Sequence, residues 1–237
     1  MSEETTESQQ GATKRRGSLF FKLFVFIVIA GVIAGAGYFL VKNGIGGSNQ
    51  AVAMVNGEKI TRTVYDERYA RLAASITAQG QSATTTEAVA AIKNQTLDNL
   101  ITETLILKAA EKENIKANEE AINTQLAQSK SQFADEDTFA KELTAQGFTK
   151  STFRKFLTRN NIIQQYLAVH IDISSATASQ EEVTALYNQA AAGNANIPPL
   201  AEIRTQVENQ IVQTKQQQLV TKFIEQLKAS SVIETLI

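Results

Sequence analysis

Few side chains in this chain have the types and spacing that catalysis or metal binding requires. His170 is the only histidine and cysteine is absent. The lack of cysteine excludes disulfides, thiol nucleophiles and Cys-ligated metals together. A solitary histidine near the end of a predicted helix, where the dipole tolerates positive charge, is best interpreted as structural. We therefore expect no catalytic residue, no metal site and no cofactor.

The acidic triplet Asp135-Glu136-Asp137 resembles part of a calcium loop. It lacks the glycine and the distal glutamate that such a loop needs. Acidic residues at the start of a helix explain the triplet better. No phosphate-binding glycine loop or nucleophile–base pair is visible in the sequence.

The apolar run Leu23–Val41 predicts a transmembrane signal-anchor helix within residues 19–42. Helical geometry gives this run a length of roughly 28 Å, close to the thickness of the hydrocarbon core. Lys14, Arg15, Arg16 and Lys22 precede the run, whereas only Lys42 follows it closely. The positive-inside rule then predicts a single-pass protein of the cell (inner or cytoplasmic) membrane, with a cytoplasmic N-terminus and an extracytoplasmic C-terminal part.

A removable signal peptide is the alternative interpretation of this segment. Ala34-Gly35-Ala36 has the small residues of a cleavage site. The run continues through Tyr38–Val41, however, and so reaches the length of a spanning helix. The length favours an uncleaved anchor in contact with the lipid bilayer.

Composition divides the rest of the chain. Residues 1–18 are polar and predict a disordered cytoplasmic tail, and the glycine-rich residues 43–50 predict a linker. Residues 51–237 are long enough for one domain with a sizeable core. They carry 18 Lys and Arg against 21 Asp and Glu, without a basic patch, so we do not expect nucleic acid as a partner.

The outer domain is predicted to be mainly helical. Its only prolines are Pro198 and Pro199, and its glycines are few, which favours long helices. Apolar periodicity and capping residues predict helices at 61–78, 87–114, 118–133, 135–147, 149–171, 180–192 and 200–228.

Two strand-like segments lie at the ends of this domain. Ala51–Ile60 contains the turn signal Asn56-Gly57, and Val232–Ile237 is rich in β-branched residues. An isolated strand cannot satisfy its backbone groups, so we expect these two segments to pair. The predicted fold is mainly α, with a small β pairing of the N- and C-terminal strands.

Several motifs follow one another in a recognisable order. They are V-N-G-E-x-I-T at Val55–Thr61, L-I-x-x-x-L-I-L-x-x-A-x-K at Leu100–Lys112, F-x-K-x-L-x-x-x-x-I-I-x-x-Y-L from Phe153, and a Gln-rich helix before I-E-x-L-I. Together they resemble the SurA/PrsA-type extracytoplasmic chaperones, in their SurA-N-like helical domain. The resemblance covers about Ala51–Ile237 and implies binding of unfolded or newly secreted polypeptide clients.

A departure from this family's pattern argues against enzymatic activity. Many such proteins carry a parvulin-type prolyl isomerase domain between the penultimate and final helices. Here that interval is only Gly193–Pro198, and the paired histidines of parvulin chemistry are absent. We therefore expect a chaperone without its own isomerase domain.

Five aromatic residues are candidates for client binding, because aromatics offer large contact area at little entropic cost. They are Tyr65, Tyr69, Phe153, Phe156 and Tyr166. Taken singly, each of them fits the helical core better than a client site.

Two other functions stay open at the level of sequence. One is a peptidyl-prolyl cis-trans isomerase with an unrecognised site. The other is a structural envelope protein with one dedicated partner. The oligomeric state, the clients and the helix faces of the client groove are not determined by the sequence.

Overall fold

A computed structural model describes residues 49–193 and 197–237, and within them the chain is mainly helical with one small sheet. This confirms the predicted fold class for that part of the chain. The elements in chain order are β1 (Ala51–Val55), β2 (Glu58–Thr61), α2 (Arg62–Ala78), α3 (Thr86–Lys112), α4 (Glu119–Lys130), α5 (Glu136–Ala145), α6 (Lys150–His170), the 3₁₀ turn η1 (Ile173–Ser175), α7 (Gln180–Gly193), α8 (Leu200–Ala229) and β3 (Ile233–Thr235).

The first two strands form a hairpin at the predicted turn, so Ala51–Ile60 supplies two strands of the sheet. Asn56 and Gly57 occupy its turn with φ of 50° and 82°. Both angles lie in the left-handed region that a two-residue hairpin turn requires, and Asn and Gly are the residues that tolerate it best. The turn sequence therefore fixes the register of β1 against β2, with Val55 opposite Glu58.

β3 pairs antiparallel with β1, and the strand order is β2-β1-β3. The predicted pairing of the two terminal segments is confirmed. The strand is shorter than the predicted Val232–Ile237, and Val232, Leu236 and Ile237 are exposed. The register pairs cover Ala53–Val55 of β1, and one further backbone bond flanks them on each side, from the Leu236 N–H to the Val52 carbonyl oxygen and from the Asn56 N–H to the Val232 carbonyl oxygen.

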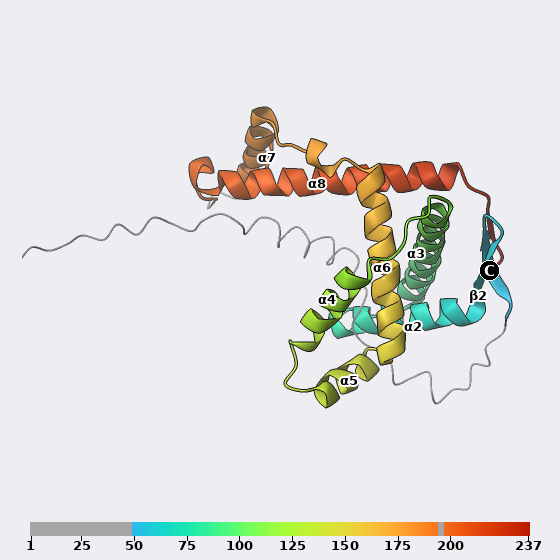
Figure 1. The fold of residues 1–237 in the computed structure, drawn as a ribbon. Helices are drawn as coiled ribbons and strands as arrows, with labels where there is room; N and C mark the ends of the chain where they lie inside the picture. The colour runs from blue at the N-terminus through green and yellow to red at the C-terminus, as the bar shows by residue number, and fades with distance from the viewer. Residues whose placement is uncertain (1–48, 194–196) are drawn as a thin grey trace, which may run out of the picture.

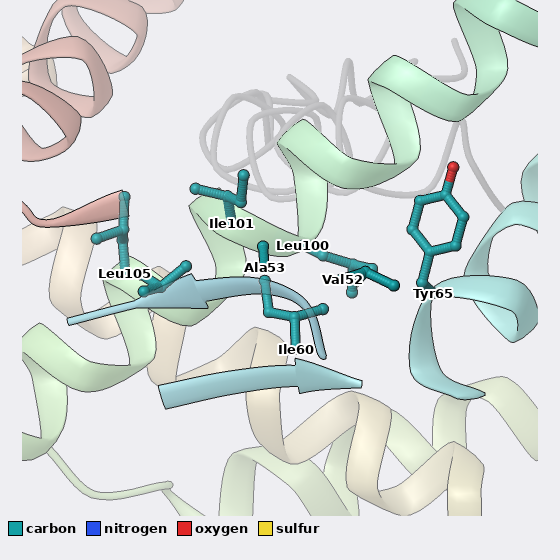
Figure 2. Packing of buried hydrophobic residues seen from close by; sticks show 8 residues of the cluster. Val52, Ala53, Ile60, Tyr65, Leu100, Ile101 and Leu105 are labelled. Atoms are coloured by element: carbon teal, nitrogen blue, oxygen red, sulfur yellow. The ribbon is translucent and has the colours of Figure 1, made fainter. Parts of the chain in front are cut away.

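The core beneath the sheet joins both strands of the hairpin to α3. Figure 2 shows side chains of β1 and β2 directed toward those of α3. The cluster consists of Val52, Ala53, Val55, Ile60, Tyr65, Leu100, Ile101 and Leu105, none of which is more than 7% exposed. Ile233 of β3 and Leu227 of α8 pack against it, so the C-terminal segment closes the same core as the N-terminal one.

Side-chain caps begin most of the helices where the sequence predicts. Thr61 accepts from the Val64 N–H, Asn118 from the Ala121 N–H and Asp135 from the Thr138 N–H. Ser179 and Glu182 form a capping box at the start of α7 with reciprocal bonds. α4 ends at Lys130 rather than near Phe133, because Phe133 turns back to pack on Phe139.

The long helices cross one another (Figure 1). α3 packs against α6, and α8 crosses near their ends, with the sheet at one end of α8 and α7 beside the other end. Phe223 and Leu227 of α8 pack against α3 and α6, whereas Val207 and Ile211 pack against Val183 of α7. The apolar side chains of this one helix therefore pack into two separate clusters.

No helix within residues 49–193 and 197–237 is long and apolar enough to cross a membrane. The predicted tail, the predicted anchor Leu23–Val41 and most of the predicted linker lie outside the described residues.

Candidate functional site

A groove of about 720 Å³ lies beside the sheet, open to solvent. Its walls come from β2, the first turn of α2, α3, the segment between α3 and α4, and α6. The lining residues are Glu58, Lys59, Ile60, Thr61, Val64, Leu100, Glu103, Thr104, Leu107, Lys108, Glu111, Asn114, Ile115, Lys116, Ala117, Arg159 and Ile162.

Apolar side chains at different depths give the groove a hydrophobic floor. Ile60 and Leu100 are buried, whereas Leu107, Ile115 and Ile162 are half-buried. Val64 is 44% exposed at the rim. A concave apolar surface with polar groups at its border is the usual setting for ligand binding.

One side of the groove is the free edge of the sheet. Four consecutive residues of β2 line it, although successive side chains of a strand point to opposite faces. The strand must therefore border the groove with its backbone edge. Glu58 is bonded to Val55 across the turn, so the alternation of an antiparallel ladder directs the N–H and C=O of Lys59 away from β1, toward that edge.

Ion pairs hold part of the rim in place. Lys108 contacts Glu111 at 3.0 Å and Glu58 at 3.1 Å. These partners raise the pKa of Lys108, with the hydrogen bond to Glu111 as the largest cause. On the opposite wall, Arg159 of α6 contacts Glu103 of α3 at 3.0 Å. The rim thus carries both signs of charge, and its carboxylates are engaged by cations of the chain itself.

The five aromatic candidates do not share one surface. Tyr65 is 4% exposed in the core beneath the sheet, and its hydroxyl donates to the Lys93 carbonyl oxygen at 3.4 Å. Burial raises the pKa of Tyr65. Tyr69 is half-buried against the separate cluster of Leu72, Ala83 and Ile92.

The other three aromatics lie on α6. Phe153 and Phe156 stack on each other at 6.2 Å and belong to the cluster that joins α4, α5 and α6. Tyr166 is 4% exposed and packs on Phe223 of α8 at 5.9 Å. None of the five lines the groove. Their role in client binding stays a prediction, and only Tyr69 and Phe153 are accessible without opening a cluster.

His170 is the last residue of α6, and its ring contacts one residue at the end of α3 and one residue of α8. Its Nε2 lies 2.8 Å from Oε2 of Glu113, just after α3, and its ring stacks on Phe223 of α8. Asp135-Glu136-Asp137 begins α5 as expected, and within the described ranges no group of three or more His, Asp or Glu residues is placed to hold a metal ion.

The sequence did not reveal the groove residues. The available signal was the apolar surplus of α3, where Leu100, Ile101, Leu105, Ile106 and Leu107 cannot share one face of a helix. Leu105 faces the sheet and Ile106 faces α6, which leaves Leu107 at the groove. Which face becomes a groove depends on what the other elements cover.

Comparisons with known proteins agree with this fold. Residues 12–167 match the family model described as the SurA-like N-terminal domain. The chain is 27% identical over 132 residues to the foldase protein PrsA of Clostridium botulinum (strain 657 / Type Ba4). That alignment takes in 51% of this chain and 39% of the relative, so much of the relative's length has no counterpart in it. Because the family model matches well over half of the chain, this protein belongs to the SurA-like N-terminal domain family, of the SurA/PrsA type.

Proposed function

We propose that this protein is a membrane-anchored, extracytoplasmic chaperone that holds unfolded or newly secreted polypeptides in the groove beside β2. Membership of the SurA-like family and the likeness to a foldase support a chaperone role. The observation that carries the assignment to this site is the meeting of an accessible apolar floor with a free strand edge.

The groove fits an extended chain rather than a compact ligand. The backbone of Lys59 offers one donor and one acceptor to a segment that lies along β2, as in strand addition to a sheet edge. Val64, Leu107 and Ile162 then receive alternate apolar side chains. Backbone hydrogen bonds do not depend on the side chains of the client, which suits a chaperone with many clients.

Modest affinity follows from the same geometry. β2 is only four residues long, so few ladder bonds are available to a client. Micromolar binding corresponds to about −8 kcal/mol, which retains a client without trapping it. An anchor formed by Leu23–Val41 would keep the groove near chains that emerge at the membrane and raise their effective concentration. No isomerase step is part of the proposal.

Light scattering from an aggregating unfolded protein tests this function. The full-length chain should suppress aggregation at near-stoichiometric amounts, and Val64→Ser combined with Leu107→Ser should weaken suppression. Val169→Ser is the matched control, because Val169 is also an exposed helical valine, 69% exposed, and lies outside the groove. Circular dichroism verifies that each variant is folded.

Two results would contradict the proposal. A folded wild-type chain that suppresses aggregation of none of several clients would exclude a general chaperone and favour a protein with one dedicated partner. Equal loss in the groove variant and in Val169→Ser would remove the groove as the binding site.

A further inference from the structure

Three arginine side chains gather where α2, α3 and α6 meet. Arg68 of α2 donates to Oε2 of Glu103 at 2.8 Å, and Arg159 of α6 donates to Oε1 at 3.0 Å. Both oxygens of this carboxylate are therefore occupied by guanidinium groups. One negative charge faces two positive charges, which leaves one positive charge over, in a place where Arg68 and Glu103 are only 18% and 21% exposed.

Arg71 adds a third positive charge, one helical turn after Arg68. No carboxylate of residues 49–193 or 197–237 forms an ion pair with it, and its guanidinium lies over the Phe148 ring at 5.5 Å. Burial lowers the pKa of Arg71 and the charge of Arg68 lowers it further, whereas the charges of Glu67 and Glu103 act in the opposite direction. The arginines thus repel one another across a partly desolvated space.

The cluster also contains an unused donor. Nε of Arg68 is buried and has no hydrogen-bond partner among the described residues. Arg159, by contrast, is 40% exposed and lines the groove together with Glu103. Arg68 is therefore buried behind the groove wall, whereas Arg159 presents its charge to the groove itself.

The remaining charges of the groove partly offset one another. Glu58 and Glu111 share the single cation Lys108, so this trio has a net negative charge. Lys116 lines the groove and forms no ion pair with a described residue. Over the whole lining, the four cations Lys59, Lys108, Lys116 and Arg159 outnumber the three carboxylates of Glu58, Glu103 and Glu111, so the net charge is positive.

We infer that Arg159, with Arg68 and Arg71 behind it, selects client segments that carry an Asp or Glu among apolar residues, by binding that side-chain carboxylate at the groove wall. The inference rests on the proposed function, because the groove is the same. A guanidinium presents paired donors that match a carboxylate, and the contact is stronger where water is partly excluded. A segment that lies along β2 passes through the groove, so the carboxylate it presents comes from a side chain rather than from a chain end.

Isothermal titration calorimetry with short peptides tests the selection. The peptides are unstructured, acetylated and amidated, built from Ala, Ser, Val and Leu, and differ only in a central Glu, Gln or Lys. The full-length chain is held in nanodiscs of zwitterionic lipid. We expect the Glu peptide to bind about tenfold more tightly than the Gln peptide, as for a charge-assisted hydrogen bond, and the Lys peptide to bind most weakly. Added salt should reduce the difference.

Variants of the chain show which residue is responsible for the preference for the Glu peptide. Arg159→Gln should remove most of the preference for Glu, and Arg159→Lys should restore part of it. Lys222→Gln removes an exposed charge of α8 outside the groove and should leave the preference unchanged. Glu103→Gln frees the arginines from their internal partner and should tighten binding of the Glu peptide, a gain that misfolding cannot produce.

Each failure has its own signature. Equal affinity for the Glu and Gln peptides overturns the inference and leaves the proposed function standing. A preference that follows a free C-terminus instead of the central Glu also overturns it. If none of the peptides binds the folded chain, the proposed function fails first.

Discussion

Asn56 and Val232 bind each other through a reciprocal pair of hydrogen bonds, 176 positions apart in the chain. The Val232 N–H donates to Oδ1 of Asn56 at 2.9 Å, and the Asn56 N–H donates to the Val232 carbonyl oxygen at 2.8 Å. The residue that shapes the first turn therefore also fixes the start of the last strand.

Replacing Asn56 should separate these two roles. Asn56→Gly keeps the left-handed backbone and loses both side-chain bonds, the one accepted from the Val232 N–H and the one donated to Ser231 Oγ, at a cost of about 1 kcal/mol for each. Asn56→Ala loses the same bonds and adds roughly 1–2 kcal/mol of backbone strain. Urea unfolding measures both free energies. Equal stability of the two variants would show that φ at this position carries no cost.

Glycine substitution should matter at the turn and not at the end of α7. Gly57 has φ of +82°, and no atom lies within 4 Å of the position that a Cβ would take, so Gly57→Ala meets only backbone strain, about 1 kcal/mol or more. Gly193 also has free space around it, and its φ lies outside the left-handed region. Gly193→Ala should therefore be close to neutral in thermal unfolding. A comparable loss in both variants would contradict this reasoning.

α7 and the first half of α8 should unfold locally before the rest of the described chain, because the second half of α8 packs on α3 and α6. Val183 is 1% exposed in a small cluster with Val207 and Ile211, separate from the core beneath the sheet. Val183→Ala should speed amide exchange in α7 and leave the protection of α3 unchanged. Leu105→Ala, in the main core, should instead cost about 2–5 kcal/mol and lower protection throughout. Identical exchange profiles for the two variants would argue for one cooperative unit.

The start of α5 should make stability sensitive to acid. The Thr138 N–H holds the pKa of Asp135 below its ordinary value, and Lys150, with Lys130, does the same for Glu136. Because these pKa values are lower in the folded state, the stabilisation is complete above the unfolded values, which are about 4, and disappears as the pH falls through the folded values. Asp135→Asn keeps a capping oxygen without a titrating charge, so its unfolding free energy should fall less steeply below about pH 4. Parallel profiles in urea unfolding at several pH values would exclude a contribution from Asp135.

Much of the local structure was determined by the sequence. Asn56-Gly57 specifies its hairpin turn, and Thr61, Asn118 and Asp135 begin their helices because each side chain satisfies an N–H only a few residues away. The pairing of the two ends was also accessible, since a lone strand must find a partner for its backbone groups. The turn and the helix caps depend on hydrogen bonds between residues close in sequence. The pairing of the two ends follows because each strand needs a neighbour for its backbone groups, and the other terminal segment was the strand available.

Only the tertiary structure decided the site. Periodicity shows that Tyr65, Phe156 and Tyr166 lie on apolar faces, but helix crossing decides that those faces are covered. The same crossing leaves Leu107 and Arg159 uncovered at the groove. It also brings Arg68, Glu103 and Arg159 together from three helices. Exposure and charge clustering depend on contacts between distant segments, and no local pattern in a single sequence encodes which face is left without a partner.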